Sequence, residues 1–366
     1  MGRRVLVTGL STFWGGRVAQ ALEKDAGTDV IIGLDTREPR VELERTEYVR
    51  TDESYSILSR IVRAAEIDTI VHTFLVVDST QMPSRQVHEI NVIGTMNLFA
   101  AASQSGSKVN SVVVKSSSLV YGATHRDPVW FAESTPRSAT PRHRVERSLV
   151  EVESYVRDYA IDHPHVAVTT LRFSNVLGPD IVTPMSRALQ LPAVPAIFGF
   201  DPRFQFLHEG DVVRALLFVL DRRISGVYNV AGDGLLPWSE TATICGKHRA
   251  WLPPFATGLL TAPLSRLGVP LTPELIDLLR FGRGIDNRRL KQAGFRYDYT
   301  SAGAVEAFAQ SARLRSTIGE PRPAYTYERD VEQFFRHSPA VVRTRDTDAG
   351  SEGATGTADA DIDPNG

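Results

Sequence analysis

A strand–turn–helix pattern at the start of the chain constrains its fold more than any other feature. The apolar run Val5–Val7 leads into a Thr-Gly turn, and the stretch GGRVAQAL begins a helix at Gly15. A glycine directly after a strand lets the chain turn tightly, and a second glycine at a helix start lets backbone N–H groups approach a pyrophosphate. Gly9 and Gly15 hold these two places. The pattern therefore predicts the phosphate-binding turn of a dinucleotide site.

Short β-rich runs alternate with helical patterns through the first half of the chain. We predict strands at Arg4–Thr8, Val30–Asp35, Thr69–His72, Ser111–Ser116 and Val168–Arg172, and helices at Arg17–Ala26, Ser56–Ala65, Gln86–Ser103 and Arg144–Ala160. The strands are apolar nearly throughout, as expected when helices cover both faces of a parallel sheet. Right-handed crossovers then predict an α/β fold with a doubly wound, Rossmann-type parallel sheet, whose ligands bind at the carboxyl ends of the strands.

Asp35 ends the second predicted strand, roughly 20 residues after the first helix begins, where dinucleotide-binding proteins carry an acidic residue. A carboxylate at this place accepts hydrogen bonds from both adenosine ribose hydroxyls and repels a 2′-phosphate. It therefore favours NAD over NADP. Arg37 weakens this preference, because it could pair with a phosphate or stay in solvent. A structural reading of Asp35, as a loop or helix-capping carboxylate, stays open.

The second half of the chain is less regular, with clustered prolines after Gly178, a helical run at 208–223 and a strand at 226–232. The end of the chain has almost no large apolar residue, and such a segment cannot offset its ordering entropy. We expect a dinucleotide-binding domain at 1–178, a smaller, irregular substrate-side lobe at 179–337 from which 205–232 returns to the main sheet, and a disordered acidic tail at 338–366.

Composition excludes several classes of protein. The 366 residues carry 41 basic and 43 acidic side chains, which argues against a nucleic-acid binder that relies on a strong positive field. The single cysteine allows no internal disulfide. No apolar stretch of about 18 residues occurs, so we expect no membrane span and, by default, a cytoplasmic protein. No metal site is predicted.

Ordered motifs reveal a family resemblance over most of the chain. They are VTG…G with Asp35, TDES, IVHT, INVIGTMNL, VVKSSSLVYG, LRFSNVLGP, LHEGDVVRAL and IDNRRLKQAGF. Together they resemble the extended short-chain dehydrogenase/reductase family, in its nucleotide-sugar epimerase/dehydratase branch, and bacterial proteins similar to UDP-glucose 4-epimerase. The resemblance implies NAD, a small-molecule substrate such as a nucleotide sugar, and transient hydride transfer. It also implies a possible homodimer through the helices predicted at 86–103 and 144–160.

The resemblance also assigns site residues. Those implied to contact the cofactor are Gly9, Thr12, Phe13, Trp14, Gly15, Asp35, Thr36, Asp52, Thr73, Phe74, Leu75 and Asn91. Phe13 and Trp14 would lie over the pyrophosphate, and Asp52 would accept from the adenine amino group. Ser117 matches the catalytic serine or threonine of the family, and Asn175 matches its substrate-contacting asparagine. His208 matches a substrate-side histidine, and the arginine often found four residues before it is replaced by Phe204, so the neighbouring Arg203 could serve instead.

Two further departures bear on the chemistry. Thr12 replaces the middle glycine of the turn, which should crowd it without necessarily abolishing binding. The Tyr-x-x-x-Lys pair, in which the lysine lowers the pKa of a catalytic tyrosine and holds the nicotinamide ribose, is missing. The corresponding pairs are His143/Arg147, Arg144/Ser148 or Val145/Leu149, depending on register. A positioned acid or base is worth about 10²–10⁴ in rate.

His143 is the chemically sensible substitute, since imidazole titrates near neutrality and Arg147 would lie one helical turn further on. The alternative is an exposed basic helix start with no catalytic role. Tyr121 is a second candidate base. Lys115, among valines at the end of the predicted fifth strand, either reaches the cofactor or extends to the sheet edge.

Three functions follow from these observations. The first is an NAD-dependent enzyme of the epimerase/dehydratase type, with Ser117 orienting the substrate hydroxyl and His143 or a water molecule taking its proton. The second is a protein that binds NAD with little chemistry, as a sensor or assembly component. The third is a reductase for a lipid-linked or apolar substrate, from the aromatic residues Phe204, Phe206, Trp238 and Trp251, although such residues more often belong to a core.

Overall fold

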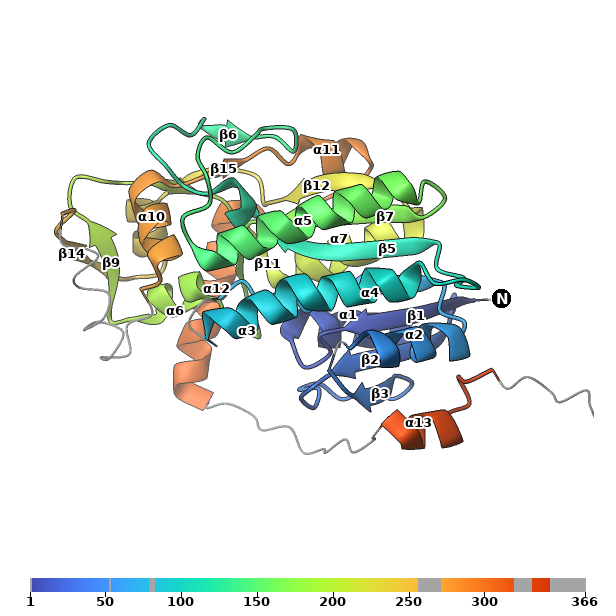
Figure 1. Ribbon diagram of the computed structural model, residues 1–366. Helices are drawn as coiled ribbons and strands as arrows, with labels where there is room; N and C mark the ends of the chain where they lie inside the picture. Colours follow the sequence, from blue (N-terminus) through green and yellow to red (C-terminus); the bar gives the residue numbers. More distant parts are fainter. Residues whose placement is uncertain (1, 53, 79–82, 256–270, 319–330, 343–366) are drawn as a thin grey trace, which may run out of the picture.

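The structure is a computed structural model that describes residues 2–52, 54–78, 83–255, 271–318 and 331–342 (Figure 1). Seven parallel strands form its central sheet in the order β3-β2-β1-β4-β5-β7-β12. Their bounds are β1 Arg3–Thr8, β2 Thr28–Asp35, β3 Glu47–Arg50, β4 Thr69–His72, β5 Ser111–Ser117, β7 Ala167–Phe173 and β12 Gly226–Val230. The predicted doubly wound sheet is confirmed, and its strand order reverses between β1 and β4, where such sheets bind ligands. The four-residue edge strand β3 was missing from the strands predicted by residue pattern, because both its ends are charged.

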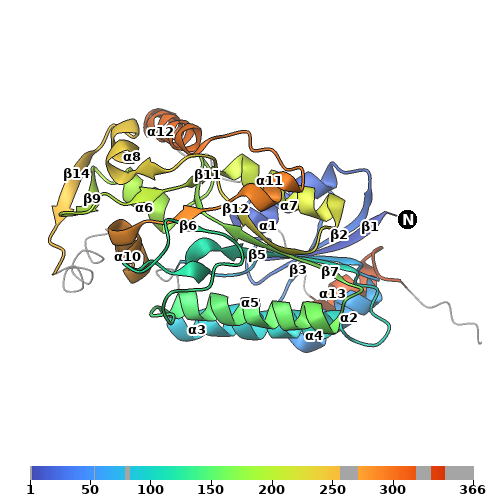
Figure 2. The same cartoon turned by 90° about the horizontal axis from the view of Figure 1, so that it is seen from above.

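Helices cover both faces of the sheet (Figure 2). One face carries α2 Tyr55–Ala64, α3 Ser84–His88, α4 Thr95–Ala102, α5 Arg144–Asp162 and α13 Val331–His337, and the other carries α1 Phe13–Glu23, α7 Glu209–Arg222 and α11 Arg288–Gln292. Successive strand residues point to opposite faces, so Leu6 packs into the first layer while Val5 and Val7 pack into the second. This alternation buries the strands on both sides and explains their continuous apolar sequence.

The predicted helix at 86–103 forms as a helical run that contains a π-helical turn, Glu89–Gly94, between α3 and α4. Ile93 and Met96 are exposed on this run. Homodimerisation through this run and α5 stays a prediction. None of the helices in the described part of the chain combines the length and apolar character needed to span a bilayer.

A smaller lobe lies beside the carboxyl ends of the strands and has its own hydrophobic core. Its elements are the helices α6 Pro184–Gln190, α8 Trp238–Ile244, α10 Pro273–Phe281 and α12 Ser301–Ile318, and the paired strands β8 Asn175–Leu177 with β11 Phe206–His208, β9 Ala193–Ile197 with β14 His248–Leu252, β10 Arg203–Phe204 with β13 Leu236–Pro237, and β6 Trp130–Phe131 with β15 Gly284–Ile285. Phe204, Phe206 and Trp238 are buried in this core, so they form no substrate surface, and Trp251 is exposed. These positions give the apolar-substrate hypothesis no support.

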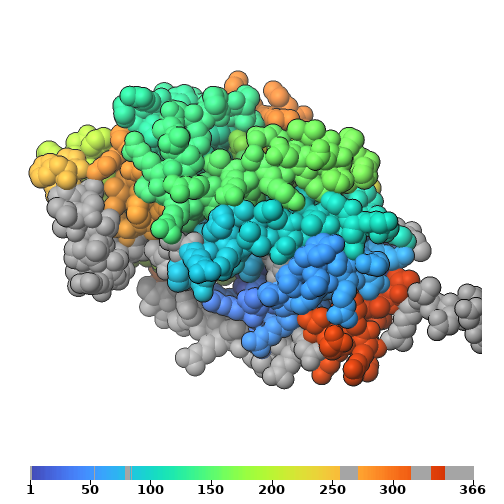
Figure 3. Space-filling model, in the orientation of Figure 1, coloured from blue at the N-terminus to red at the C-terminus, as the bar shows by residue number. Residues whose placement is uncertain are grey.

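Two segments of the second half lie with the main sheet. Helix α7 packs beside α1, and β12 extends the sheet next to β7. Helix α13 and the residues after it pack against the amino-terminal elements (Figures 1 and 3). Ala340 is buried, its carbonyl accepts a hydrogen bond from Arg4, and Val342 N donates to Ala64 O. The tail predicted from 338 therefore begins with packed residues, because Ala340 supplies an apolar anchor, and the rest of it, 343–366, lies outside the described residues.

Candidate active site

The glycine turn has no room for larger residues at its two predicted glycines. A Cβ on Gly15 would lie 2.3 Å from Gly9 O, and Gly9 has φ +74° with Phe74 Cα 2.9 Å from its Cβ position. Thr12, by contrast, has φ −80° and caps α1: its hydroxyl donates to Gly9 O at 2.7 Å and accepts from Gly15 N at 3.2 Å. The turn therefore accommodates a threonine here, because the Thr12 side chain folds back onto the turn and hydrogen-bonds to its backbone. Phe13 and Trp14 follow at the half-buried start of the helix.

Asp35 lies beside this turn at the carboxyl end of β2. Its buried carboxylate accepts hydrogen bonds from Ser11 N at 2.9 Å and Arg37 N at 3.1 Å. The backbone N–H groups at the start of α1, the two glycines and this carboxylate fit the pyrophosphate and ribose of a dinucleotide. Thr36, next in sequence, is exposed. Asp52, after β3, is also exposed and accepts from Ser54 N at 3.3 Å, so the adenine contact expected of it stays a prediction.

The segment after β4 closes the other side of the turn. Thr73 donates to Thr8 O at 2.7 Å, Phe74 packs against Gly9, and Leu75 is buried. Asn91, in the π-helical turn, holds this segment with both ends of its amide: Oδ1 accepts from Val76 N at 2.7 Å and Nδ2 donates to Val76 O at 2.9 Å. The predicted cofactor residues of this region therefore lie side by side, and their contact with a cofactor stays a prediction.

A cavity opens to solvent next to Trp14, at the carboxyl ends of β5 and β7. Its wall includes Lys115 and Ser117 from β5, Phe173 from β7, Ser174 and Asn175. Ser117 Oγ accepts from Leu119 N at 3.2 Å, which leaves its O–H free to donate toward the cavity. The Ser174 hydroxyl is buried without a hydrogen-bond partner among the described residues. A buried polar group in that state normally requires a partner that a bound ligand or water supplies.

Lys115 is buried inside this cavity. Its Nζ donates to Leu75 O at 2.7 Å and lies 4.9 Å from the centre of the Trp14 ring. Burial lowers the pKa of the amine to about 7. The amine is therefore buried against Leu75 and Trp14 and does not extend to the sheet edge, and its contact with a cofactor stays a prediction.

Arg283, from the loop before β15, also lines the cavity and was not expected from the sequence. Its guanidinium donates to Gly122 O and to Ser118 Oγ, and burial lowers its pKa to about 10. Nothing in the surrounding sequence RFGRGID singles this arginine out. The tertiary structure reveals it, because the fold brings Arg283 next to Ser118 and Gly122, which follow β5.

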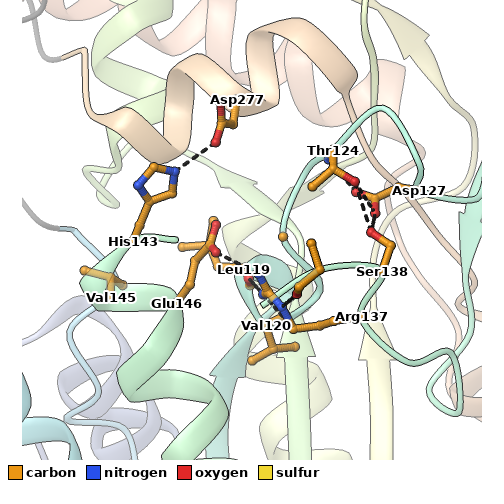
Figure 4. A network of polar contacts seen from close by, with 12 residues as sticks. Leu119, Val120, Thr124, Asp127, Arg137, Ser138, His143, Val145, Glu146 and Asp277 are labelled. Carbon is orange, nitrogen blue, oxygen red and sulfur yellow. Dashed lines mark hydrogen bonds and ion pairs between the residues drawn. The ribbon is translucent and has the colours of Figure 1, made fainter. Parts of the chain in front are cut away.

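His143 points toward Asp277 of α10 (Figure 4). It precedes α5, and its Nε2 lies 2.8 Å from Asp277 Oδ2 on α10. Arg147 is exposed, and neither side chain belongs to the described cavity wall. In the first turn of α5, Glu146 pairs with Arg137 at 2.8 Å. The roles predicted for His143 and Arg147 in catalysis stay predictions, and the observed contact of His143 is a link between the two lobes.

The remaining predicted residues are distributed unevenly around the cavity. Asn175 lines it, and its Nδ2 donates to Gln205 O at 3.0 Å. His208 caps α7 by accepting from Gly210 N at 3.1 Å and stacks on Tyr299, while the side chain of Arg203 is exposed. Neither His208 nor Arg203 is in the described cavity wall.

Tyr121, the second candidate base, is buried and donates to Asn229 Oδ1 at 2.8 Å, a structural role.

The His143–Asp277 contact predicts a pH-dependent contribution to stability. The hydrogen bond to Asp277 raises the pKa of His143. The stabilisation is therefore complete below the unfolded pKa of about 6.5, and it is lost as pH rises through the higher folded value. We expect His143→Ala to cost about 1–2 kcal/mol at pH 5.5 and much less at pH 9. Urea unfolding at both values checks this, with the exposed His248→Ala as control; an equal loss at both pH values would contradict it.

Taken together, the switch point of the sheet, the glycine turn and Asp35 define a Rossmann-type dinucleotide-binding protein. No group of His, Cys, Asp and Glu in the described residues could hold a metal ion. The model of the NAD dependent epimerase/dehydratase family matches residues 5–231. The chain belongs to this NAD-dependent family, as its motifs predicted.

Individual relatives agree with this assignment. An uncharacterized protein of Mycobacterium tuberculosis is 32% identical over 326 residues, covering 87% of this chain and 86% of its own length. The dTDP-D-glucose 4,6-dehydratase of Mus musculus is 28% identical over 249 residues, 62% of this chain and 68% of its own. The crystal structure of UDP-glucose 4-epimerase from Thermus thermophilus in complex with NAD superposes with a TM-score of 0.66 at 20% identity, covering 85% of this chain and 99% of that one, which confirms the fold.

Proposed function

We propose that the protein is an NAD-dependent oxidoreductase or isomerase that acts on a nucleotide sugar by oxidising one of its hydroxyl groups transiently. The observation that carries this proposal is the gathering of Ser117, Ser174 and Asn175 in one cavity beside the glycine turn. Relatives with this fold act on nucleotide sugars, among them the UDP-glucose 4-epimerase and the dTDP-glucose dehydratase named above. NAD, when bound, would accept a hydride from the substrate and return it.

The chain's own residues would hold and orient the two ligands. Gly9, Gly15 and Asp35 would hold the pyrophosphate and adenosine ribose, and Asn91 would keep the segment after β4 in place. The Ser117 hydroxyl would donate a hydrogen bond to the reacting oxygen, and the Ser174 hydroxyl and Asn175 amide would contact the sugar. Trp14 and Phe173, whose ring centres lie 4.9 Å apart, would exclude water from the wall they share.

A second function has one observation in its favour. The family pair Tyr-x-x-x-Lys is missing, and His143 and Arg147, which could replace it, lie outside the described cavity wall. A protein that binds NAD with little catalysis, as a sensor or assembly component, would need neither. The two functions differ in a single measurable property, which is turnover.

The test uses the purified full chain. We expect bound nucleotide detectable by absorbance and mass spectrometry, binding of NAD in preference to NADP, and interconversion of UDP-glucose and UDP-galactose or turnover of another nucleotide sugar. We expect Ser117→Ala to lower kcat by about 10²–10³, because it removes a hydrogen-bond donor at the developing charge, with little change in NAD affinity. Tight NAD binding without turnover of any nucleotide sugar would favour the non-catalytic function, and tighter binding of NADP would contradict the argument from Asp35.

A further inference from the structure

Lys115 and Ser117 share one face of β5. Side chains alternate along a strand, so residues two apart point the same way, and both of these line the cavity. Ser116, between them, also borders the cavity, but its hydroxyl donates to Glu153 of α5 on the opposite face of the sheet at 2.5 Å. The Lys115 amine and the Ser117 hydroxyl therefore lie on the same side of β5 and face the cavity together.

The Lys115 amine has no ion-pair partner among the described residues, although Glu274 of α10 lines the same cavity. Lys115 is 2% exposed. A neighbouring titratable group is His72 of strand β4, whose ring lies between the hydroxyls of Thr8 and Thr95 at 2.7 and 3.0 Å and whose pKa burial and the Lys115 charge both lower. Burial lowers the pKa of His72 to about 3, so this imidazole is neutral at physiological pH.

The other charged groups near this end of the sheet are Glu274 and Arg283, which line the same cavity, and two ion pairs. Glu153 pairs with Arg172 behind β5, and Asp78, after β4, pairs with Arg187. A lysine buried without a carboxylate is costly, and an apolar residue of similar length would fill the same space at lower cost. Perturbed groups of this kind cluster at functional sites. Leu75 O is the one acceptor of the amine among the described residues, which leaves the amine other directions in which to meet a ligand.

We propose that the Lys115 amine, beside the Ser117 hydroxyl, takes and returns the proton of the substrate hydroxyl, in place of the missing Tyr-x-x-x-Lys pair. This rests on the proposed oxidation of a hydroxyl. The neutral amine bonds to the proton as the O–H bond breaks and becomes ammonium; the carbon gives up a hydride to oxidised NAD, and a carbonyl forms. The ammonium gives the proton back when the hydride returns, so the cycle needs no other reactant.

The first test does not depend on turnover. The chain has five lysines, so lysine-selective ¹⁵N labelling gives few signals, and Lys115→Met assigns one of them by its loss. We expect that signal to titrate near pH 7 in the protein without substrate. Methionine suits the buried position, and the denaturation midpoint of the variant checks that it folds. Titration of Lys115 above pH 10 would overturn the proposal.

The second test is kinetic and uses whichever nucleotide sugar the wild-type protein is found to turn over in the test of the proposed function. We expect Lys115→Met to lower kcat at least a hundredfold, to change KM little, and to remove the limb of the pH–rate profile near neutrality. Lys108→Met is the matched control, because Lys108 is exposed and pairs with Glu66 at the surface; its rate and profile should equal those of the wild type.

The outcomes separate the two proposals. If the wild type turns over no nucleotide sugar, the proposed function fails and the role of Lys115 fails with it. If the wild type is active and Lys115→Met keeps its rate and pH profile, only the role of Lys115 is overturned. Loss of the profile in His143→Gln but not in Lys115→Met would likewise overturn it and assign the proton transfer to His143.

Discussion

Gly15→Ala is expected to abolish dinucleotide binding and to destabilise the fold. The added Cβ would lie 2.3 Å from Gly9 O and 2.7 Å from Gly9 C, and both atoms belong to the backbone of the turn, which cannot rotate away as a side chain could. The start of α1 must therefore move from the position in which its N–H groups face a pyrophosphate. We expect NAD affinity to fall more than about a hundredfold and the free energy of unfolding to fall by about 2–4 kcal/mol.

Gly303→Ala is the matched control for this variant. Gly15 and Gly303 are each the third residue of a helix, α1 and α12, but a Cβ on Gly303 would meet its nearest atom at 3.4 Å. Alanine is a better helix former than glycine by about 1 kcal/mol, so this variant should be neutral or stabilising and should bind NAD normally. Titration calorimetry with NAD and urea unfolding measure both effects. Normal NAD binding by Gly15→Ala would show that the turn does not hold the cofactor.

Arg172→Met is expected to have the largest effect on stability outside the turn. Arg172 of β7 donates to both carboxylate oxygens of Glu153 on α5, at 2.5 to 3.1 Å, and also to the Tyr121 hydroxyl at 2.8 Å. Both charged side chains are largely buried. Removal of the arginine leaves a carboxylate buried without a counter-charge, which typically costs 3–5 kcal/mol. We expect a loss of about 3–5 kcal/mol in urea unfolding.

A double variant tests whether the unpaired charge causes that loss. In the double variant Arg172→Met with Glu153→Gln, neither member of the buried pair carries a charge, and the amide oxygen at position 153 can still accept from Ser116. The double variant should therefore have a higher free energy of unfolding than Arg172→Met alone. Arg85→Met is the control, since Arg85 and Glu89 form an exposed ion pair at 3.1 Å and such pairs contribute little. A double variant no more stable than Arg172→Met would contradict this account.

Local signals were enough to predict most of the sheet. The strands of the central sheet appear in the sequence as apolar runs because both faces of each strand are covered, and that requirement acts on every residue of the run. The edge strand β3 was not predicted from its residue pattern, because Glu47 and Arg50 at its ends interrupt the apolar run. Helix α1 begins at Phe13 rather than at the predicted Arg17, because the Thr12 hydroxyl caps it. The glycine pattern of the turn did not predict this contact.

The opening turn shows what the sequence alone determined. Gly9, Gly15 and Asp35 act through local backbone geometry and through the chemistry of one carboxylate at a strand end, so their identity and spacing were sufficient to predict a dinucleotide site. The chain's membership of an NAD-dependent family followed from ordered motifs of the same local kind.

The reaction site depends on contacts that only the tertiary structure makes. His143 meets Asp277 from 134 positions away, and Arg283 meets Gly122 from 161 positions away. The environment of Lys115 is built from Trp14 and the Leu75 carbonyl, which lie on other elements. Burial and distance set the properties of these groups, and neither is a property of a residue type. The fold therefore decided where His143 and Lys115 lie, because it alone determines which side chains share a cavity.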